Sequence, residues 1–280
     1  MSTPENPFGG SEVPVTSDSR TELPANMEYA GIQERFPVWS LGDVVKLALL
    51  AVLAVFFCTL LALSIAAVLP PFRHLTPAQL ATDPRVIVPG QGAAYLIVIA
   101  YIRRLLTRHY DMEFSEAIHW RWPNLVWPAY LAGGVVLALS IQGLSHLLPI
   151  PKQMPIDQFF TTATGAWVMA VFGVAIAPLV EELFFRGLLF PALARRLGLV
   201  LGIIVTGALF GFIHASQLGK AWAPVLVLFL VGVALTMVRS MARSVAAAFL
   251  VHAGYNLTLF TMMYFASDGF HHLERVVNGS

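Results

Sequence analysis

Long apolar runs alternate with short polar segments along most of the chain. Seven of these runs approach the roughly 20 residues that a helix needs to cross about 30 Å of hydrocarbon. They lie at about 44–69, 86–106, 125–148, 165–185, 198–216, 222–239 and 243–266. In the third run, Gly133, Gly134 and Gly143 would let neighbouring helices approach closely. The pattern predicts an all-α fold, a polytopic transmembrane helix bundle of about 7–8 spans around an intramembrane cavity.

The segments outside these runs have a different character. Residues 1–38 are rich in Pro, Ser, Thr, Glu and Asn and lack apolar periodicity, which predicts a disordered tail. Between Asp111 and Pro123, aromatic and charged residues mix, which suits a short interfacial helix. The predicted division is therefore a tail at 1–38, N-terminal transmembrane helices with an interfacial segment at 39–124, a membrane core at 125–266 and a C-terminal tail at 267–280.

Composition supports a location in the lipid bilayer. Hydrophobic residues make up 57% of the chain and charged residues 12%, whereas a soluble domain carries about 25% charge. The net charge of +1 gives no reason to expect nucleic acid as a partner. The compact chain without sorting signals indicates a multi-pass protein of a bacterial plasma membrane.

Basic residues are concentrated in every second loop. They are Arg103, Arg104, Arg108, Arg121, Arg195, Arg196, Arg239 and Arg243. By the positive-inside rule, these loops and the N-terminus face the cytoplasm, and the C-terminus lies outside.

Two carboxylates and an arginine follow the charge-free run from Thr164 to Val180. A charge at bilayer depth costs from roughly 2.5 to more than 10 kcal/mol, so such groups usually pair and serve a function. On a helix, Glu182 and Arg186 would stand one turn apart, with Glu181 about 100° away from Glu182. This spacing predicts a structural Glu182–Arg186 pair and a free Glu181. The alternative is a helix end whose charged groups snorkel to the interface.

Two further motifs place polar groups on apolar helices. Phe210 and His214 are four residues apart, as are His252 and Asn256, so each pair would share a helix face. His214 could instead simply end a helix, and His252 with Asn256 could be a polar clamp between helices.

A carboxylate, two imidazoles and a carboxamide are sufficient to hydrolyse a peptide bond in a dry cavity. Glu181 could take a proton from water and return it to the leaving amine, while His214 positions or helps to deprotonate that water. His252 and Asn256 could donate hydrogen bonds to the oxyanion. The predicted cavity would then be catalytic.

A metal version would use nearly the same atoms. Glu181, His214 and His252 could bind one divalent metal such as zinc and leave a fourth position for water, which would make the protein a metalloprotease. The helical zinc signature of two histidines with an intervening glutamate is absent from the sequence. Both versions, with a metal cofactor and with none, remain open.

The three motifs together resemble those of a known family. They are Glu-Glu-x-x-x-Arg at Glu181, Glu182 and Arg186, Phe-x-x-x-His at Phe210 and His214, and His-x-x-x-Asn at His252 and Asn256. Their order and separation over about residues 160–265 resemble the CaaX protease and bacteriocin-processing (CPBP, or Abi) family of intramembrane endopeptidases, and are similar to type 2 CaaX prenyl proteases.

The resemblance implies a bundle of about eight helices around a cytoplasm-facing cavity, with residues 125–266 as the catalytic core. Water activation is then assigned to Glu181 and His214, and oxyanion stabilisation to His252 and Asn256. Structural support would come from Glu182, Arg186 and Phe210. The implied partner is a membrane-associated protein or peptide substrate, prenylated (CaaX-type) or otherwise tethered.

Two other functions use the same residues. A non-catalytic membrane scaffold could retain the bundle and bind a lipidated peptide. A proton- or ion-coupled transporter could use the polar groups as a relay, although such proteins usually show paired broken helices in two related halves, and no duplication is seen.

Overall fold

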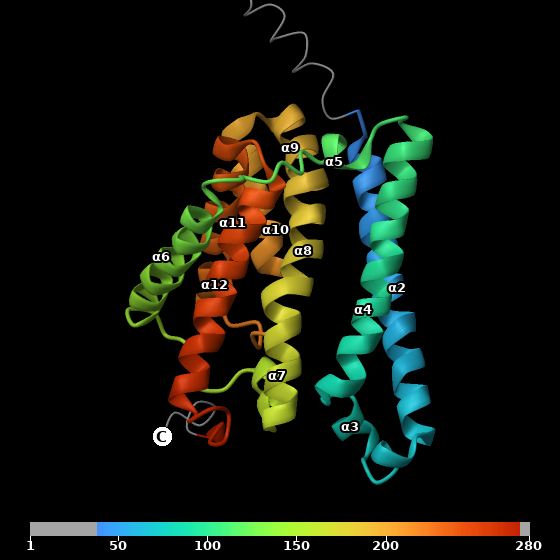
Figure 1. Cartoon of the computed structure of the whole chain (residues 1–280), viewed down its shortest axis with the longest axis vertical. Coiled ribbons are helices and arrows are strands. Elements are labelled where there is room, and N and C mark those ends of the chain that lie inside the picture. The colour runs from blue at the N-terminus through green and yellow to red at the C-terminus, as the bar shows by residue number, and fades with distance from the viewer. Residues whose placement is uncertain (1–37, 275–280) are drawn as a thin grey trace, which may run out of the picture. The chain divides into compact units, whose positions relative to one another are not determined.

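The computed structural model describes residues 38–274, and these form helices and connecting turns without any strand (Figure 1). The tail predicted at 1–38 lies outside this range except for its last residue. Within residues 38–274, six helical stretches are long and apolar enough to cross a membrane, and a seventh is shorter. The predicted polytopic helix bundle is therefore confirmed.

Each predicted apolar run corresponds to one membrane helix or helical stretch. In chain order these are α2 (Leu41–Val68), α4 (Pro84–Arg104), α6 (Trp127–Ser145), the continuous stretch from α7 (Ala163–Val171) through α8 (Ala177–Glu182) to α9 (Phe190–Leu197), α10 (Leu199–Ile213), α11 (Trp222–Ala242) and α12 (Val245–Ala266). Short elements connect them: η1 (Pro70–Phe72), α3 (Pro77–Leu80), α5 (Phe114–Ala117) and η3 (Pro155–Phe160). The short helix expected between 111 and 123 is α5.

The stretch from α7 to α9 contains two π-helical segments, η4 (Phe172–Ile176) and η5 (Leu183–Leu189). A proline closely follows each segment, Pro178 after η4 and Pro191 after η5. Proline lacks an N–H, and its ring clashes with the carbonyl four residues earlier, which in both cases lies inside the π-helical segment. The wider turns relieve this clash and allow the helix to continue for 35 residues.

Helices α2 and α4 form an antiparallel hairpin, drawn in blue and green in Figure 1. Gly90 allows the close approach, since a Cβ there would lie 3.1 Å from the Cys58 carbonyl oxygen. At one end, the Tyr110 hydroxyl donates a hydrogen bond to Asp43 Oδ2 at 2.6 Å. Burial and this hydrogen bond raise the pKa of Tyr110 to about 12. Trp39, 2% exposed, ties the hairpin to the core by donating to the Leu188 carbonyl at 3.0 Å.

Helices α6 and α12 pack through glycines. A Cβ at Gly134 would collide with the Val251 carbonyl oxygen and lie 2.6 Å from the Tyr255 nitrogen, and a Cβ at Gly254 would collide with Leu131. The packing role predicted for Gly134 is therefore confirmed. It is wrong for Gly143, because a Cβ there would have no neighbour within 4 Å.

Helix α10 is shorter than the predicted run at 198–216. Its 15 residues span about 22 Å at 1.5 Å per residue, less than the roughly 30 Å of the hydrocarbon core. It packs against α11, where a Cβ at Gly211 would lie 2.9 Å from the Phe229 nitrogen. His214 is thus the C-cap of a short helix and begins the turn that leads to α11.

Candidate active site

Glu182 and Arg186 form the expected ion pair in the interior of the bundle. Arg186 Nη1 lies 2.8 Å from Glu182 Oε1, and both side chains are 0% exposed, so they do not snorkel. Arg186 also donates to the Gly232 carbonyl at 2.9 Å and to the Thr236 hydroxyl at 3.3 Å. These contacts tie the α8–η5 junction to α11. Among the described residues, Glu182 Oε2 is buried without a hydrogen-bond partner.

The two motif histidines are oriented by acceptors at their Nδ1 atoms. His252 Nδ1 lies 2.8 Å from Glu182 Oε1, and His214 Nδ1 lies 2.8 Å from the Phe210 carbonyl oxygen. Because a carboxylate and a carbonyl only accept hydrogen bonds, each Nδ1 carries the proton in the neutral ring. Each Nε2 therefore presents a lone pair.

The Glu181 carboxylate lies between these two Nε2 atoms. Its Oε1 is 3.9 Å from His214 Nε2, and its Oε2 is 3.9 Å from His252 Nε2. These gaps are too long for direct hydrogen bonds and suit bridging by a water molecule. The structure thus brings together three of the four residues for which the sequence predicted catalytic roles.

The Phe210 ring packs against both histidines and against Arg186. Its centroid lies 4.9 Å from that of His214 and 5.7 Å from that of His252, and the Arg186 guanidinium carbon lies 4.7 Å from it. Asn256, the fourth predicted residue, donates from Nδ2 to the Gly173 carbonyl in η4 at 2.6 Å. One N–H of its amide remains for another acceptor.

Two cavities meet at Glu181. The first, called the groove here, has a volume of about 670 Å³ and lies among α2, α4 and residues 180–185. The second, called the chamber, has about 380 Å³ and is lined by side chains that include Phe160, His252 and Asn256. Both cavities are lined mainly by apolar side chains.

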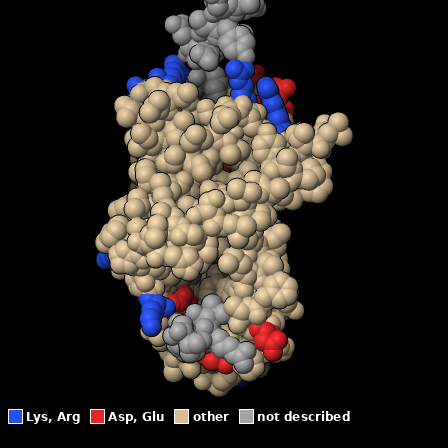
Figure 2. Space-filling view, turned by 90° about the vertical axis from the view of Figure 1, so that its left-hand side faces the viewer, with Lys and Arg blue, Asp and Glu red and all other residues tan. Residues whose placement is uncertain are grey.

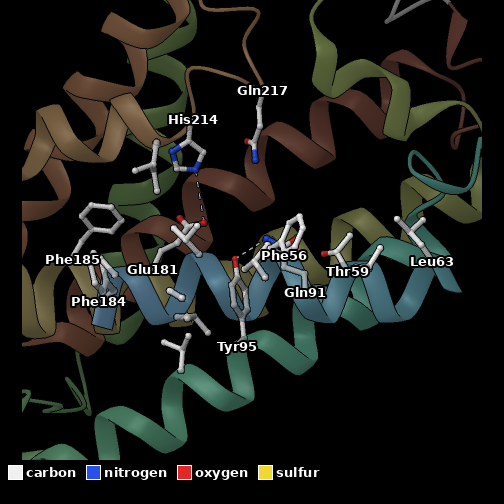
Figure 3. A pocket seen from close by; sticks show the side chains of 18 residues that line it. Phe56, Thr59, Leu63, Gln91, Tyr95, Glu181, Phe184, Phe185, His214 and Gln217 are labelled. Atoms are coloured by element: carbon white, nitrogen blue, oxygen red, sulfur yellow. Dashed lines mark hydrogen bonds and ion pairs between the residues drawn. The ribbon is translucent and has the colours of Figure 1, made fainter. Parts of the chain in front are cut away.

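Five residues line both cavities: Gln91, Tyr95, Glu181, His214 and Gln217. Figure 3 shows these side chains around the groove, with Tyr95 and Gln91 reaching in from α4. Sequence reasoning missed Gln91, Tyr95 and Gln217. The available signal was the spacing of Gln91 and Tyr95, which are two polar residues one helical turn apart in an apolar run.

Glu181, His214 and His252 are also the possible metal ligands that the sequence indicates. Within residues 38–274, no group of three His, Cys, Asp or Glu side chains is arranged so that it could hold a metal ion. The metal version of the site with Glu181, His214 and His252 therefore stays a prediction, and we derive no step through a metal.

The helix bundle defines a multi-pass membrane protein, and its interior holds a cluster of one glutamate and two histidines. Residues 162–258 match a family model described as "Type II CAAX prenyl endopeptidase Rce1-like". Over this segment the chain is similar to the CPBP or CAAX protease family, and the similarity supports a membrane peptidase. No curated protein and no solved structure matched the chain.

Proposed function

We propose that this protein is an intramembrane endopeptidase that hydrolyses a peptide bond near the membrane in a lipidated (CaaX-type) or otherwise tethered protein or peptide. The observation that carries the proposal is the Glu181 carboxylate, 3.9 Å from the Nε2 atoms of both His214 and His252. It lies where an apolar groove, suited to a membrane anchor, meets a second cavity. The family match supports the same conclusion.

In the proposed reaction, Glu181 and His214 hold the attacking water. The water oxygen forms a bond with the carbonyl carbon of the scissile peptide, and its proton passes to Glu181. When the C–N bond breaks, Glu181 returns the proton to the leaving amine. The products are a carboxylate and an amine, and the second water proton stays on the new carboxyl group until it ionises.

His252 has a more restricted role than the sequence suggested. Its Nδ1–H donates a hydrogen bond to the Glu182 carboxylate, so the neutral ring offers only a lone pair at Nε2. It can donate to an oxyanion only when it holds a second proton. The remaining N–H of Asn256 is then the donor that motif three supplies to the oxyanion in every protonation state of His252.

The proposal predicts that Glu181→Gln abolishes peptide cleavage, with at least about a 100-fold loss, because an amide cannot accept the water proton. We would measure cleavage of membrane-tethered peptides, prenylated and unprenylated, by purified protein in lipid. Glu116→Gln is the matched control, since Glu116 is exposed on α5. Cleavage by Glu181→Gln at the wild-type rate would refute the mechanism.

The same assay separates the remaining alternatives. Loss of wild-type cleavage on chelation, with recovery only after metal is added back, would assign Glu181, His214 and His252 to a metal. A folded wild-type protein that binds the prenylated peptides without cleaving any of them would favour the scaffold. Cleavage of unprenylated tethered peptides would show that a prenyl group is dispensable.

A further inference from the structure

The five residues shared by the groove and the chamber form what we call the neck, and every one of them carries a polar group. They come from three separate parts of the fold: Gln91 and Tyr95 from α4, Glu181 from α8, and His214 and Gln217 from the turn after α10. A peptide that reaches Glu181 from the apolar groove must bring its N–H and C=O groups to this neck. In a dry cavity these groups need hydrogen-bond partners.

Tyr95 is held with its hydroxyl at the neck. Gln91 Nε2 donates to the Tyr95 oxygen at 3.0 Å, as the dashed line in Figure 3 shows, and the Tyr95 ring stacks on Phe172 with centroids 5.7 Å apart and planes at 15°. The hydroxyl oxygen is therefore an acceptor toward Gln91. Among the described residues, no acceptor is found for the hydroxyl proton, which is available to a ligand in the cavity.

The two residues of motif three do not belong to the neck. His252 and Asn256 line the chamber and not the groove, and Asn256 already donates to Gly173. His252 presents a lone pair in its neutral form. Asn256 thus supplies one donor to the oxyanion from the chamber, and Tyr95, which lines both cavities, offers a second donor on the groove side.

We propose that the Tyr95 hydroxyl donates a hydrogen bond to the carbonyl oxygen of the scissile peptide bond as that oxygen becomes an oxyanion, and that Gln91 positions this hydroxyl. The inference rests on the proposed peptidase function. It adds a catalytic residue from α4, outside the segment that matches the family model. Gln91 is a positioning residue because it acts through Tyr95.

The test is steady-state kinetics on Tyr95→Phe, which keeps the ring stacked on Phe172 and removes only the hydroxyl. Loss of one oxyanion donor should lower kcat about 100-fold. KM should stay within about threefold, because the lost bond is strongest in the transition state. Tyr101→Phe is the matched control on the same helix, since Tyr101 lines neither cavity, and its kcat should equal that of wild type.

A double-mutant cycle shows whether Gln91 positions the Tyr95 hydroxyl for catalysis or only stabilises the helix. Gln91→Met keeps the length of the side chain and removes the amide, and should lower kcat about tenfold. The double variant Gln91→Met/Tyr95→Phe should be no slower than Tyr95→Phe alone, because Gln91 acts only through the hydroxyl. Independent effects that multiply would overturn the positioning role.

The outcomes distinguish this inference from the proposed function. If wild type cleaves, Glu181→Gln does not, and Tyr95→Phe retains full kcat or changes only KM, the role of Tyr95 is refuted while the peptidase stands. If wild type cleaves no peptide of the panel, both proposals fail. A fall in kcat for Tyr95→Phe, with unchanged thermal stability and a normal Tyr101→Phe, supports the inference.

Discussion

At the scale of single residues, the buried Glu182–Arg186 pair supports the site mechanically. Its two side chains are fully buried, and Glu182 also accepts from His252, so one carboxylate connects the guanidinium to an imidazole of the site. Taking two charges out of water is costly. Removing only one partner of such a pair usually costs about 3–5 kcal/mol, because a buried charge is left uncompensated.

Arg186→Met should therefore lower the free energy of unfolding by about 3–5 kcal/mol. The double variant Glu182→Gln/Arg186→Met should recover part of this loss, since no unpaired charge remains. Chemical unfolding in detergent micelles would measure both. Arg104→Met, at an exposed position of α4, is the control and should change stability by less than about 0.5 kcal/mol. Equal stability of Arg186→Met and this control would contradict the expected role.

The residues that meet in the site were predictable from spacing, but several of their contacts were not. Motif spacing indicated that Glu181, His214 and His252 share an interior. The bond from Asn256 to Gly173 lies at a π-helical segment, which the sequence does not mark. The role of Tyr95 was not predicted, because its spacing from Gln91 also fits a stabilising side-chain contact within one helix.

At the scale of helices, the sequence located the elements well and their ends poorly. The fourth apolar run is predicted to end at about 185, just before Arg186. The structure buries Arg186 within the bundle and continues the helix to Leu197. Conversely, the fifth run was extended to 216, whereas α10 ends at Ile213, before the turn that contains His214.

The contact between α6 and α12 gives a prediction at this scale. Gly134→Ala should weaken the bundle by about 1–3 kcal/mol, because the added Cβ meets the α12 backbone and separates two helices. It should also reduce cleavage, since α12 carries His252. Gly143→Ala, on the same helix with open space around it, should be neutral or more stable by up to about 1 kcal/mol. Thermal unfolding of the two variants side by side would decide.

A loss of stability in Gly143→Ala equal to that in Gly134→Ala would contradict this account. The cost would then come from the helix itself and not from the contact with α12.

At the scale of the described molecule, charged side chains lie apart from the broad apolar surface. On the face shown in Figure 2, Lys and Arg side chains gather toward the ends, and the broad middle carries almost no charge. This distribution fits a bundle whose middle lies in hydrocarbon. The cytoplasmic position of the N-terminus, derived from the arginine-rich loops, stays a prediction.

We expect the length of α10 to make the site sensitive to the thickness of the surrounding lipid. Its outward side chains are exposed, with Val200 at 68% and Phe212 at 71%, yet its length covers only about 22 Å. A hydrophobic segment shorter than the local bilayer thins that bilayer or shifts in it, at a cost that grows with the mismatch. His214 lies at the end of this helix, so the mismatch would act on the position of its side chain.

We therefore expect cleavage to be several-fold faster in vesicles of short-chain lipids than in vesicles of long-chain lipids. Glu181→Gln provides the background at each thickness. Identical wild-type rates across the lipid series would show that a change in bilayer thickness does not reach the site through α10. If the rates do differ, membrane thickness regulates the enzyme, and the same chain would cut its substrates at different speeds in thin and thick regions of one membrane.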